Sequence, residues 1–188
     1  MQRILAVMGG ALGVLLFALL LIVAGSHLQD WQATASPGVR DYTPQEQHGR
    51  DLYVSLGCVY CHTQQVRGKG YPDVERGWGK RPSAPGDYVF DRPHLLGTMR
   101  TGPDLHNVAS RLPSDIWHFI HLYQPDALVP GSIMPPHRFL FDVVDKTDTP
   151  SDKRVIGTPP GLIPQGKALL ASKDAEALVA YLLTLSHE

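Results

Sequence analysis

The segment Cys58-Val59-Tyr60-Cys61-His62 contains both cysteines of this 188-residue chain in one C-x-x-C-H motif. Two thiols at this spacing can add to the two vinyl groups of one porphyrin, and a histidine directly after the second thiol can reach the iron. The alternatives are a redox-active dithiol, which needs a βαβ setting, and a zinc site, which needs further soft ligands. The motif therefore predicts one covalent c-type haem, attached to Cys58 and Cys61 and ligated by His62.

The N-terminal segment is the second strong feature. Ile4 to Ala24 is a run of 21 residues without a charged side chain. At about 1.5 Å rise per residue, a helix of this length spans roughly 30 Å, the thickness of the hydrocarbon core of a bilayer. The alternative is a signal peptide cleaved near Ala24-Gly25-Ser26, but the apolar core of a signal peptide is usually about 7–15 residues long. We expect an uncleaved transmembrane anchor over residues 1–27.

The orientation of this anchor follows from two independent features. Arg3 is the charged side chain that precedes the apolar run, and positive charge favours the cytoplasmic side. Because c-type haem is attached on the far side of the bacterial inner membrane, we expect a single-pass protein whose haem domain is periplasmic. Within the span, Gly9 and Gly13 form a G-x-x-x-G pair, which either fits a neighbouring helix or reflects the frequency of glycine in membrane helices.

Composition excludes some partners and predicts long loops. The formal net charge of −1 argues against nucleic acid as a partner, because no basic face can dominate. The 16 prolines and 18 glycines predict long ordered loops, which usually need a cofactor or a partner to pack against. The chain length suits one modest domain with an accessory segment.

Three helices are predicted in the remainder of the chain. Thr43-Pro44-Gln45-Glu46 is a capping box with proline in the first turn, and it predicts a helix that runs to about Leu56. Ser114 is the expected cap of a second helix over residues 116–123. Apolar residues at three- to four-residue spacing predict a third helix over residues 173–185. We expect residues 63–99 to form a long surface loop, and residues 142–165 to be irregular.

An electron-transfer haem needs a sixth ligand downstream of the motif. Met134 is favoured over Met99 because it lies in the turn-rich segment Gly131-Ser132-Ile133-Met134-Pro135-Pro136. His62 and Met134 are thus the predicted iron ligands, and a thioether raises the reduction potential relative to two imidazoles. The alternative is ligation by two histidines, for which five are available: His94, His106, His118, His121 and His137. His118 and His121 could also form a separate metal site, although a helix packed against the haem pocket fits them better.

The order of these elements resembles class I cytochrome c, in which the first helix leads directly into the haem motif. Residues 100–105, with the sequence Arg-Thr-Gly-Pro-Asp-Leu, match the Gly-Pro-x-Leu segment on the proximal side of the haem in that class. The resemblance implies that the Pro103 carbonyl accepts a hydrogen bond from Nδ1 of His62 and fixes its tautomer. Arg67 and Arg100 are candidates to pair with the haem propionates, since a guanidinium group matches a carboxylate, with solvated arginines as the alternative.

Over most of its length the chain resembles the membrane-anchored mono-haem cytochrome c subunit (subunit II, the O subunit) of cbb3-type cytochrome c oxidases. The matching segments follow one N-terminal span in the order of the family. They are Gly49-Arg50-Asp51-Leu52-Tyr53, residues 57–64, Gly86-Asp87-Tyr88-Val89-Phe90-Asp91, residues 100–105, residues 117–122, residues 129–135 and residues 176–182.

This resemblance implies a mainly α fold with three parts: a transmembrane anchor over residues 1–27, a linker over 28–42 and a class I cytochrome c-like haem domain with long irregular loops over 43–188. It implies one-electron transfer from a further cytochrome c subunit to the catalytic haem–copper subunit, which reduces oxygen, with no small-molecule substrate of its own. The alternatives are the anchored cytochrome c subunit of a nitric oxide reductase and a free-standing anchored electron shuttle. A haem-based sensor fits less well, because Met134 would fill the open position on the iron.

Overall fold

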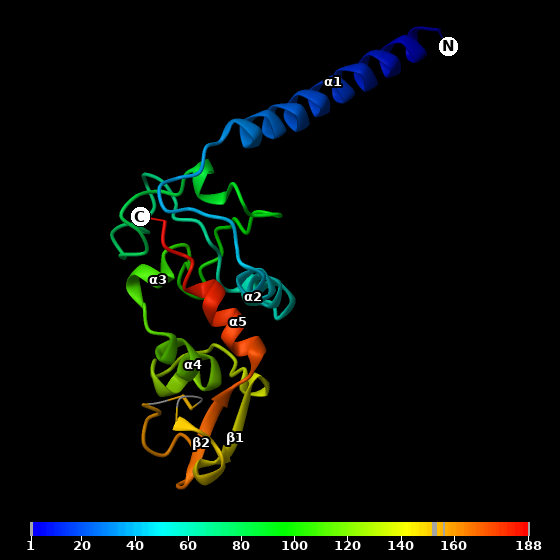
Figure 1. Cartoon of the computed structure of the whole chain (residues 1–188). Coiled ribbons are helices and arrows are strands. Elements are labelled where there is room, and N and C mark those ends of the chain that lie inside the picture. Colours follow the sequence, from blue (N-terminus) through cyan, green and yellow to red (C-terminus); the bar gives the residue numbers. More distant parts are fainter. Residues whose placement is uncertain (1, 152–153, 156, 188) are drawn as a thin grey trace. The chain divides into compact units, whose positions relative to one another are not determined.

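The computed structural model describes residues 2–151, 154–155 and 157–187, which form two compact units. One unit contains the residues up to Val39 together with Ala84–Val89, and the other contains Arg40–Ser83 and the residues from Phe90 onward. The described residues are mainly helical, with long irregular loops and a long apolar helix at the N-terminus (Figure 1). This confirms the fold class predicted from the sequence.

The first unit is dominated by α1 (Gln2–Gln32). Its residues Gln2–Leu28 are long and apolar enough to cross a membrane, and none of that stretch is buried within the protein, which is consistent with a membrane anchor. The helix continues to Gln32, so the predicted linker begins inside it. Further on, the amide of Ser36 donates to the carbonyl of Gly86 (2.9 Å), which fastens the linker to the short 3₁₀ helix η2 (Pro85–Tyr88).

In the second unit, α2 (Pro44–Ser55) begins as the sequence predicts. The amide of Glu46 donates to Oγ1 of Thr43 (3.3 Å), and the amide of Thr43 donates to Oε2 of Glu46 (2.7 Å). This reciprocal pair satisfies two amides that a helix start leaves without a partner. At the other end, Gly57 has a φ of +78°, which glycine adopts without steric cost, and it turns the chain into η1 (Cys58–Tyr60).

Helix α5 (Lys173–Leu182) crosses α2 at very close range (Figure 1). A Cβ atom at Gly49 would lie only 1.9 Å from the carbonyl oxygen of Ala177, so the two backbones are in direct contact there. Beside this crossing, the rings of Tyr53 and Tyr181 lie 5.8 Å apart in the buried core. The helix is three residues shorter than predicted, and Ser172 caps its first turn.

In the sequence, helices α3 (Val108–Arg111) and α4 (Asp115–Tyr123) follow the Pro103 segment. The predicted cap of α4 is confirmed, because Oγ of Ser114 accepts from the amide of Trp117 (3.3 Å). The short 3₁₀ helices η3 (Pro125–Ala127) and η4 (Arg138–Leu140) follow.

A two-stranded antiparallel sheet corrects the prediction that residues 142–165 are irregular. Strand β1 (Phe141–Asp145) pairs with β2 (Lys167–Ala171), with Phe141 opposite Ala171, and the 3₁₀ turn η5 (Lys146–Asp148) follows β1. The long proline- and glycine-rich connection hides the pairing, because the sequence carries none of the short turns that typically mark a hairpin. The amide of Ser172 donates to the carbonyl of Leu140 (3.0 Å), which joins the sheet to the start of α5.

Residues 63–99 contain no α-helix or strand within the described chain, as predicted, but they are more than a surface loop. Val66, Asp73 and Leu95 are buried. The amide of Gln64 donates to the carbonyl of Leu95 (3.3 Å), and the amide of Val66 donates to Oγ of Ser83 (2.8 Å). The parts of this segment that belong to the second unit therefore pack against one another.

Candidate haem site

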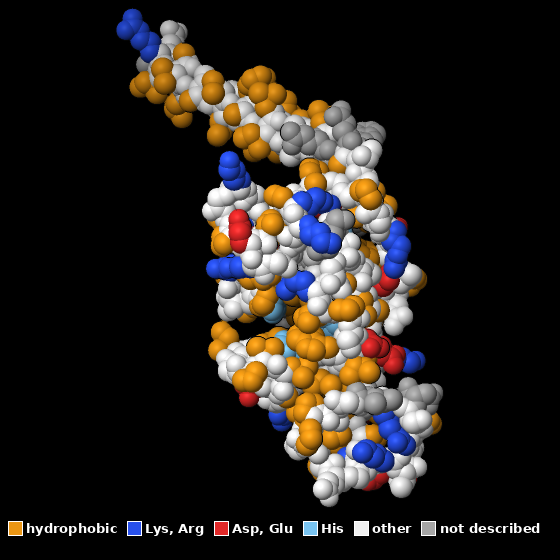
Figure 2. All heavy atoms as spheres, turned by 90° about the vertical axis from the view of Figure 1, so that its left-hand side faces the viewer, with side chains coloured by type: hydrophobic (Ala, Val, Ile, Leu, Met, Phe, Trp, Pro, Cys, Tyr) orange, Lys and Arg blue, Asp and Glu red, His pale blue; other side chains and the backbone are white. Residues whose placement is uncertain are grey.

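The second unit encloses a cavity of about 560 Å³. Its walls are mostly apolar and come from the segment after Pro103, from α4 and from α5. These wall residues include Leu105, Val108, Leu112, Leu122, Leu178 and Leu182. A cavity of this size and apolar character is typical of a site for one cofactor. The surface view shows hydrophobic side chains gathered around a hollow in which histidines are visible (Figure 2).

Both cysteines of the motif line this cavity, half-buried, as free thiols. Burial raises the pKa of Cys58 to about 11, because an apolar environment disfavours the thiolate. Cys58 is the first residue of the 3₁₀ turn η1, which follows α2 closely, and Cys61 is the residue that ends this turn. Two unpaired thiols at the wall of an apolar cavity are the donor set that covalent attachment of a porphyrin needs, so the residues fit a c-type haem.

His62 lines the same cavity with a defined tautomer. Its Nδ1 lies 2.8 Å from the carbonyl oxygen of Pro103, which can only accept, so Nδ1 is the protonated nitrogen. Burial lowers the pKa of His62, which keeps the imidazole neutral and leaves the lone pair of Nε2 available to a metal. A Cβ atom at Gly102 would lie 2.3 Å from Cε1 of His62, so the ring can pack here only because residue 102 is glycine.

Met134 also lines the cavity, on the loop that follows η3. The amide of Met134 donates to Oγ of Ser132 (3.3 Å), and Gly131 turns the chain with a φ of +79°. The rival candidate Met99 is 51% exposed and is not among the residues that line the cavity. The geometry thus brings His62 and Met134 to one site and leaves Met99 outside it.

The five histidines considered as alternative ligands divide into two groups. His94 and His106 are not among the lining residues, whereas His118, His121 and His137 are. Nε2 of His118 is within hydrogen-bond distance of the Leu112 carbonyl (2.9 Å). His121 stacks on Trp117 with ring centroids 4.6 Å apart, and burial lowers its pKa to about 4. Among the described residues no group of three or more His, Cys, Asp or Glu could hold a metal ion, so the geometry favours the packed-helix interpretation of α4.

Comparison with known families identifies the chain. The model of the family described as "Cytochrome C oxidase, mono-heme subunit/FixO" matches residues 2–159. The chain belongs to the FixO family. No curated protein matches it significantly. Membership decides between the functions that the sequence left open: the protein is the mono-haem cytochrome c subunit of a cbb3 oxidase and transfers electrons, rather than a nitric oxide reductase subunit or a free shuttle.

The FixO match shows that this subunit carries one c-type haem, and the residues that line the cavity fit such a group. Bound there, a haem would supply one-electron redox chemistry at its iron. The chain itself supplies two thiols, a neutral imidazole of fixed tautomer, a thioether and an apolar enclosure. Gly102 donates its amide to the carbonyl of Cys61 (2.9 Å), so the motif and the Pro103 segment are joined through the backbone beside His62.

The two arginines predicted to bind haem propionates in this FixO chain are engaged elsewhere. Nη2 of Arg67 lies 2.7 Å from Oδ1 of Asp73, and Nη2 of Arg100 lies 2.8 Å from Oδ2 of the same carboxylate. Neither is among the residues that line the cavity, so their role at the propionates stays a prediction. Arg111 is an arginine that does line it, and it donates to the carbonyl of Asp104. Sequence reasoning missed Arg111 because α3 is a single short turn without an apolar period.

Proposed function

We propose that Cys58 and Cys61 hold the haem of this subunit and that His62 and Met134 ligate its iron. The observation that carries this assignment is that all four side chains line one apolar cavity, with His62 oriented by the Pro103 carbonyl (2.8 Å). With His62 and Met134 both bound, the iron would have no open position for a substrate. The subunit would therefore relay single electrons and break no bonds itself.

The ligand assignment is tested with Met134→Ala in the intact complex, with Met99→Ala as the matched control. Met134→Ala is expected to lose the low-spin spectrum of the ferric c-type haem, because one axial ligand is removed. Met99→Ala is expected to keep it, since Met99 lies outside the cavity. A low-spin ferric spectrum that persists in Met134→Ala would refute the assignment and turn attention to the cavity histidines.

We further propose that electrons arrive from a second cytochrome c subunit and leave to the catalytic haem–copper subunit, which reduces oxygen. Support comes from three apolar side chains close to the cavity. Val129 and Ile133 line it and are 43% and 81% exposed. Phe139 is 68% exposed, and its ring centroid lies 5.7 Å from that of the cavity residue His137. Exposed apolar groups gathered in one place are typical of a permanent protein interface.

This partnership is tested by gentle detergent extraction followed by a reduced-minus-oxidised visible spectrum. Bands of b-type haem are expected with the c-type band in a fixed ratio. When the complex is purified through this subunit, the Ile133→Glu variant is expected to lower the ratio of b-type to c-type haem, because the subunit is released from its partners. Val54→Glu changes another exposed apolar residue, on α2, and is expected to leave this ratio unchanged. A c-type band alone in the wild-type preparation would contradict the proposed partners.

We propose, finally, that the haem domain is periplasmic and that α1 crosses the bacterial inner membrane once. Support comes from Arg3, which precedes the apolar run, and from the length of the candidate span. A reporter enzyme that folds only in the periplasm, fused after residue 188, is expected to be active. Activity of a cytoplasm-dependent reporter at the same position would contradict this orientation.

A further inference from the structure

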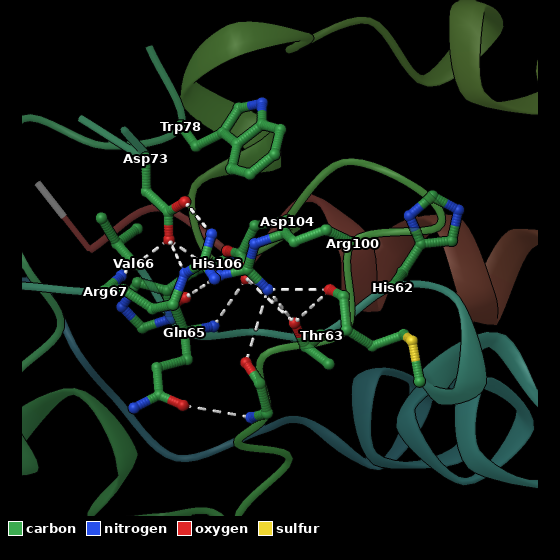
Figure 3. A network of polar contacts seen from close by, with 12 residues as sticks. His62, Thr63, Gln65, Val66, Arg67, Asp73, Trp78, Arg100, Asp104 and His106 are labelled. Atoms are coloured by element: carbon green, nitrogen blue, oxygen red, sulfur yellow. Dashed lines mark hydrogen bonds and ion pairs between the residues drawn. The ribbon is translucent and has the colours of Figure 1, made fainter. Parts of the chain in front are cut away.

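Arg100 lies at the centre of a buried polar network behind the haem motif (Figure 3). Its Nη1 donates to Oγ1 of Thr63 (2.6 Å) and to the carbonyl of Met99 (2.8 Å). Its Nη2 donates to the carbonyl of Gln65 (2.9 Å) and to Oδ2 of Asp73 (2.8 Å). The guanidinium group of Arg100, three residues before Pro103, therefore connects the Pro103 segment to Thr63 and Gln65, which follow His62 in the chain.

Asp104 completes this connection from the other side of Pro103. Its Oδ2 accepts from the amide of Gln65 (2.8 Å) and from Oγ1 of Thr63 (3.3 Å), and it lies 3.5 Å from Nη1 of Arg100. The amide of Leu105 donates to the carbonyl of Thr63 (2.9 Å). His62 and Pro103 are thus each flanked by residues of the same network, and Figure 3 shows His62 at the edge of that network.

The network pairs two arginines, Arg67 and Arg100, with two carboxylates, Asp73 and Asp104, and the contacts of Arg100 require the shape of a guanidinium group. The side chains of Asp73 and Asp104 are fully buried, and that of Arg100 is only 13% exposed. Arg67, and after it Arg100, holds the pKa of Asp73 well below its usual range, so this carboxylate stays ionised. Cζ of Arg100 lies 5.4 Å from the Trp78 ring centroid. A lysine would keep the charge, but a single ammonium nitrogen lacks the planar fork that reaches both segments at once.

We propose that Arg100 is a positioning residue for the hydrogen bond between His62 and Pro103, and through it for the reduction potential of the haem, rather than a ligand of a propionate. The proposal rests on the proposed function, in which His62 ligates the iron. A hydrogen bond from Nδ1 to a carbonyl makes the imidazole a stronger donor, and this stabilises ferric iron. Loosening the two segments lengthens that bond, so the midpoint potential rises.

The test compares Arg100→Lys with Arg67→Lys in the purified, haem-loaded complex by redox titration of the c-type absorbance. Both variants keep their charge, and both replace an arginine that pairs with Asp73. Arg100→Lys is expected to raise the midpoint potential while the low-spin spectrum is retained. Arg67→Lys is expected to keep the wild-type potential, because the hydrogen bonds of the Arg67 side chain within the described residues go to Asp73 and not to the segments on either side of His62 and Pro103. Equal shifts in both variants, or no shift in Arg100→Lys, would overturn the proposal.

A third variant covers the case in which Arg100→Lys does not assemble. Thr63→Val removes one hydroxyl partner of Arg100 and changes neither the charge nor much of the buried volume. It is expected to shift the potential in the same direction by a smaller amount, and an unchanged potential would overturn the proposal. Wild-type spectra that exclude His62 as an axial ligand would overturn the proposed function and this inference together. Wild-type His–Met ligation with no response in the variants would overturn this inference alone.

Discussion

Replacing Gly49 by alanine is expected to destabilise the haem domain although it improves helix propensity. Alanine is favoured over glycine by about 1 kcal/mol in a helix interior. Against this gain, the new Cβ would lie 1.9 Å from the oxygen and 2.5 Å from the carbon of the Ala177 carbonyl, where ordinary contact begins near 3.4 Å. Because these are backbone atoms of α5, relief requires the two helices to separate by about 1.5 Å.

The magnitude follows from that separation. Overpacking a well-packed core costs about 1–3 kcal/mol and sometimes more, and a clash between two backbones belongs at the upper end of the scale. We therefore expect a net loss of about 3 kcal/mol, even after the gain in propensity. For a chain of this size, about 1 kcal/mol changes the midpoint temperature by roughly 2–4 °C, so a fall of roughly 6–12 °C is expected.

The assay is thermal unfolding of the full-length protein, followed by circular dichroism in the haem band. Gln45→Ala, an exposed position in the first turn of the same helix, serves as the control and is expected to leave the midpoint nearly unchanged. If Gly49→Ala instead raises the midpoint, propensity outweighs packing, and the close approach of α2 to α5 is not what stabilises this crossing.

Three further outcomes follow from other contacts. Gly102→Ala is expected to displace the His62 ring, because the added carbon lies 2.3 Å from Cε1, and to shift the midpoint potential in a redox titration. Arg40 lowers the pKa of Glu46 from 4.5 to about 2. The ionised Glu46 therefore contributes its full stability above about pH 5, and this contribution is lost as the pH falls toward 2. Glu46→Gln should flatten this part of the profile of urea unfolding against pH. Ser172→Ala removes the cap of α5 and should cost about 1 kcal/mol in urea unfolding.

Features that depend on neighbouring residues were predictable from the sequence. The capping box at Thr43 involves side chain and backbone three residues apart, and so does the cap at Ser114. Their geometry is therefore encoded locally. The haem motif belongs to the same class, since both thiols and the imidazole lie within five consecutive residues. The pairing of His62 with Pro103 is a contact between distant segments, and the resemblance to class I cytochrome c is what predicted it.

Contacts between segments without periodicity were not predictable. The sheet joins β1 to β2 across a long irregular connection, and neither strand carries a strong alternation of apolar and polar residues. The partner of Arg67 and Arg100 is Asp73, which lies in a loop rich in glycine and charge, where many carboxylates would have seemed equally available. For this reason a haem propionate was predicted as the partner of the two arginines, whereas in the structure their partner is the carboxylate of Asp73.

The two sides of the cavity are built differently, and connectivity explains the difference. His62 lies between residues that the backbone joins to the Pro103 segment through Gly102 and Leu105, at 2.9 Å each, so its orientation is set by the folded chain itself. Met134 lies on a loop in which the neighbouring Ile133 is 81% exposed, and within the described residues its amide donates to Oγ of Ser132 in the same loop. Packing against a partner is therefore expected to affect the thioether side, whereas the imidazole side is fixed before any partner binds.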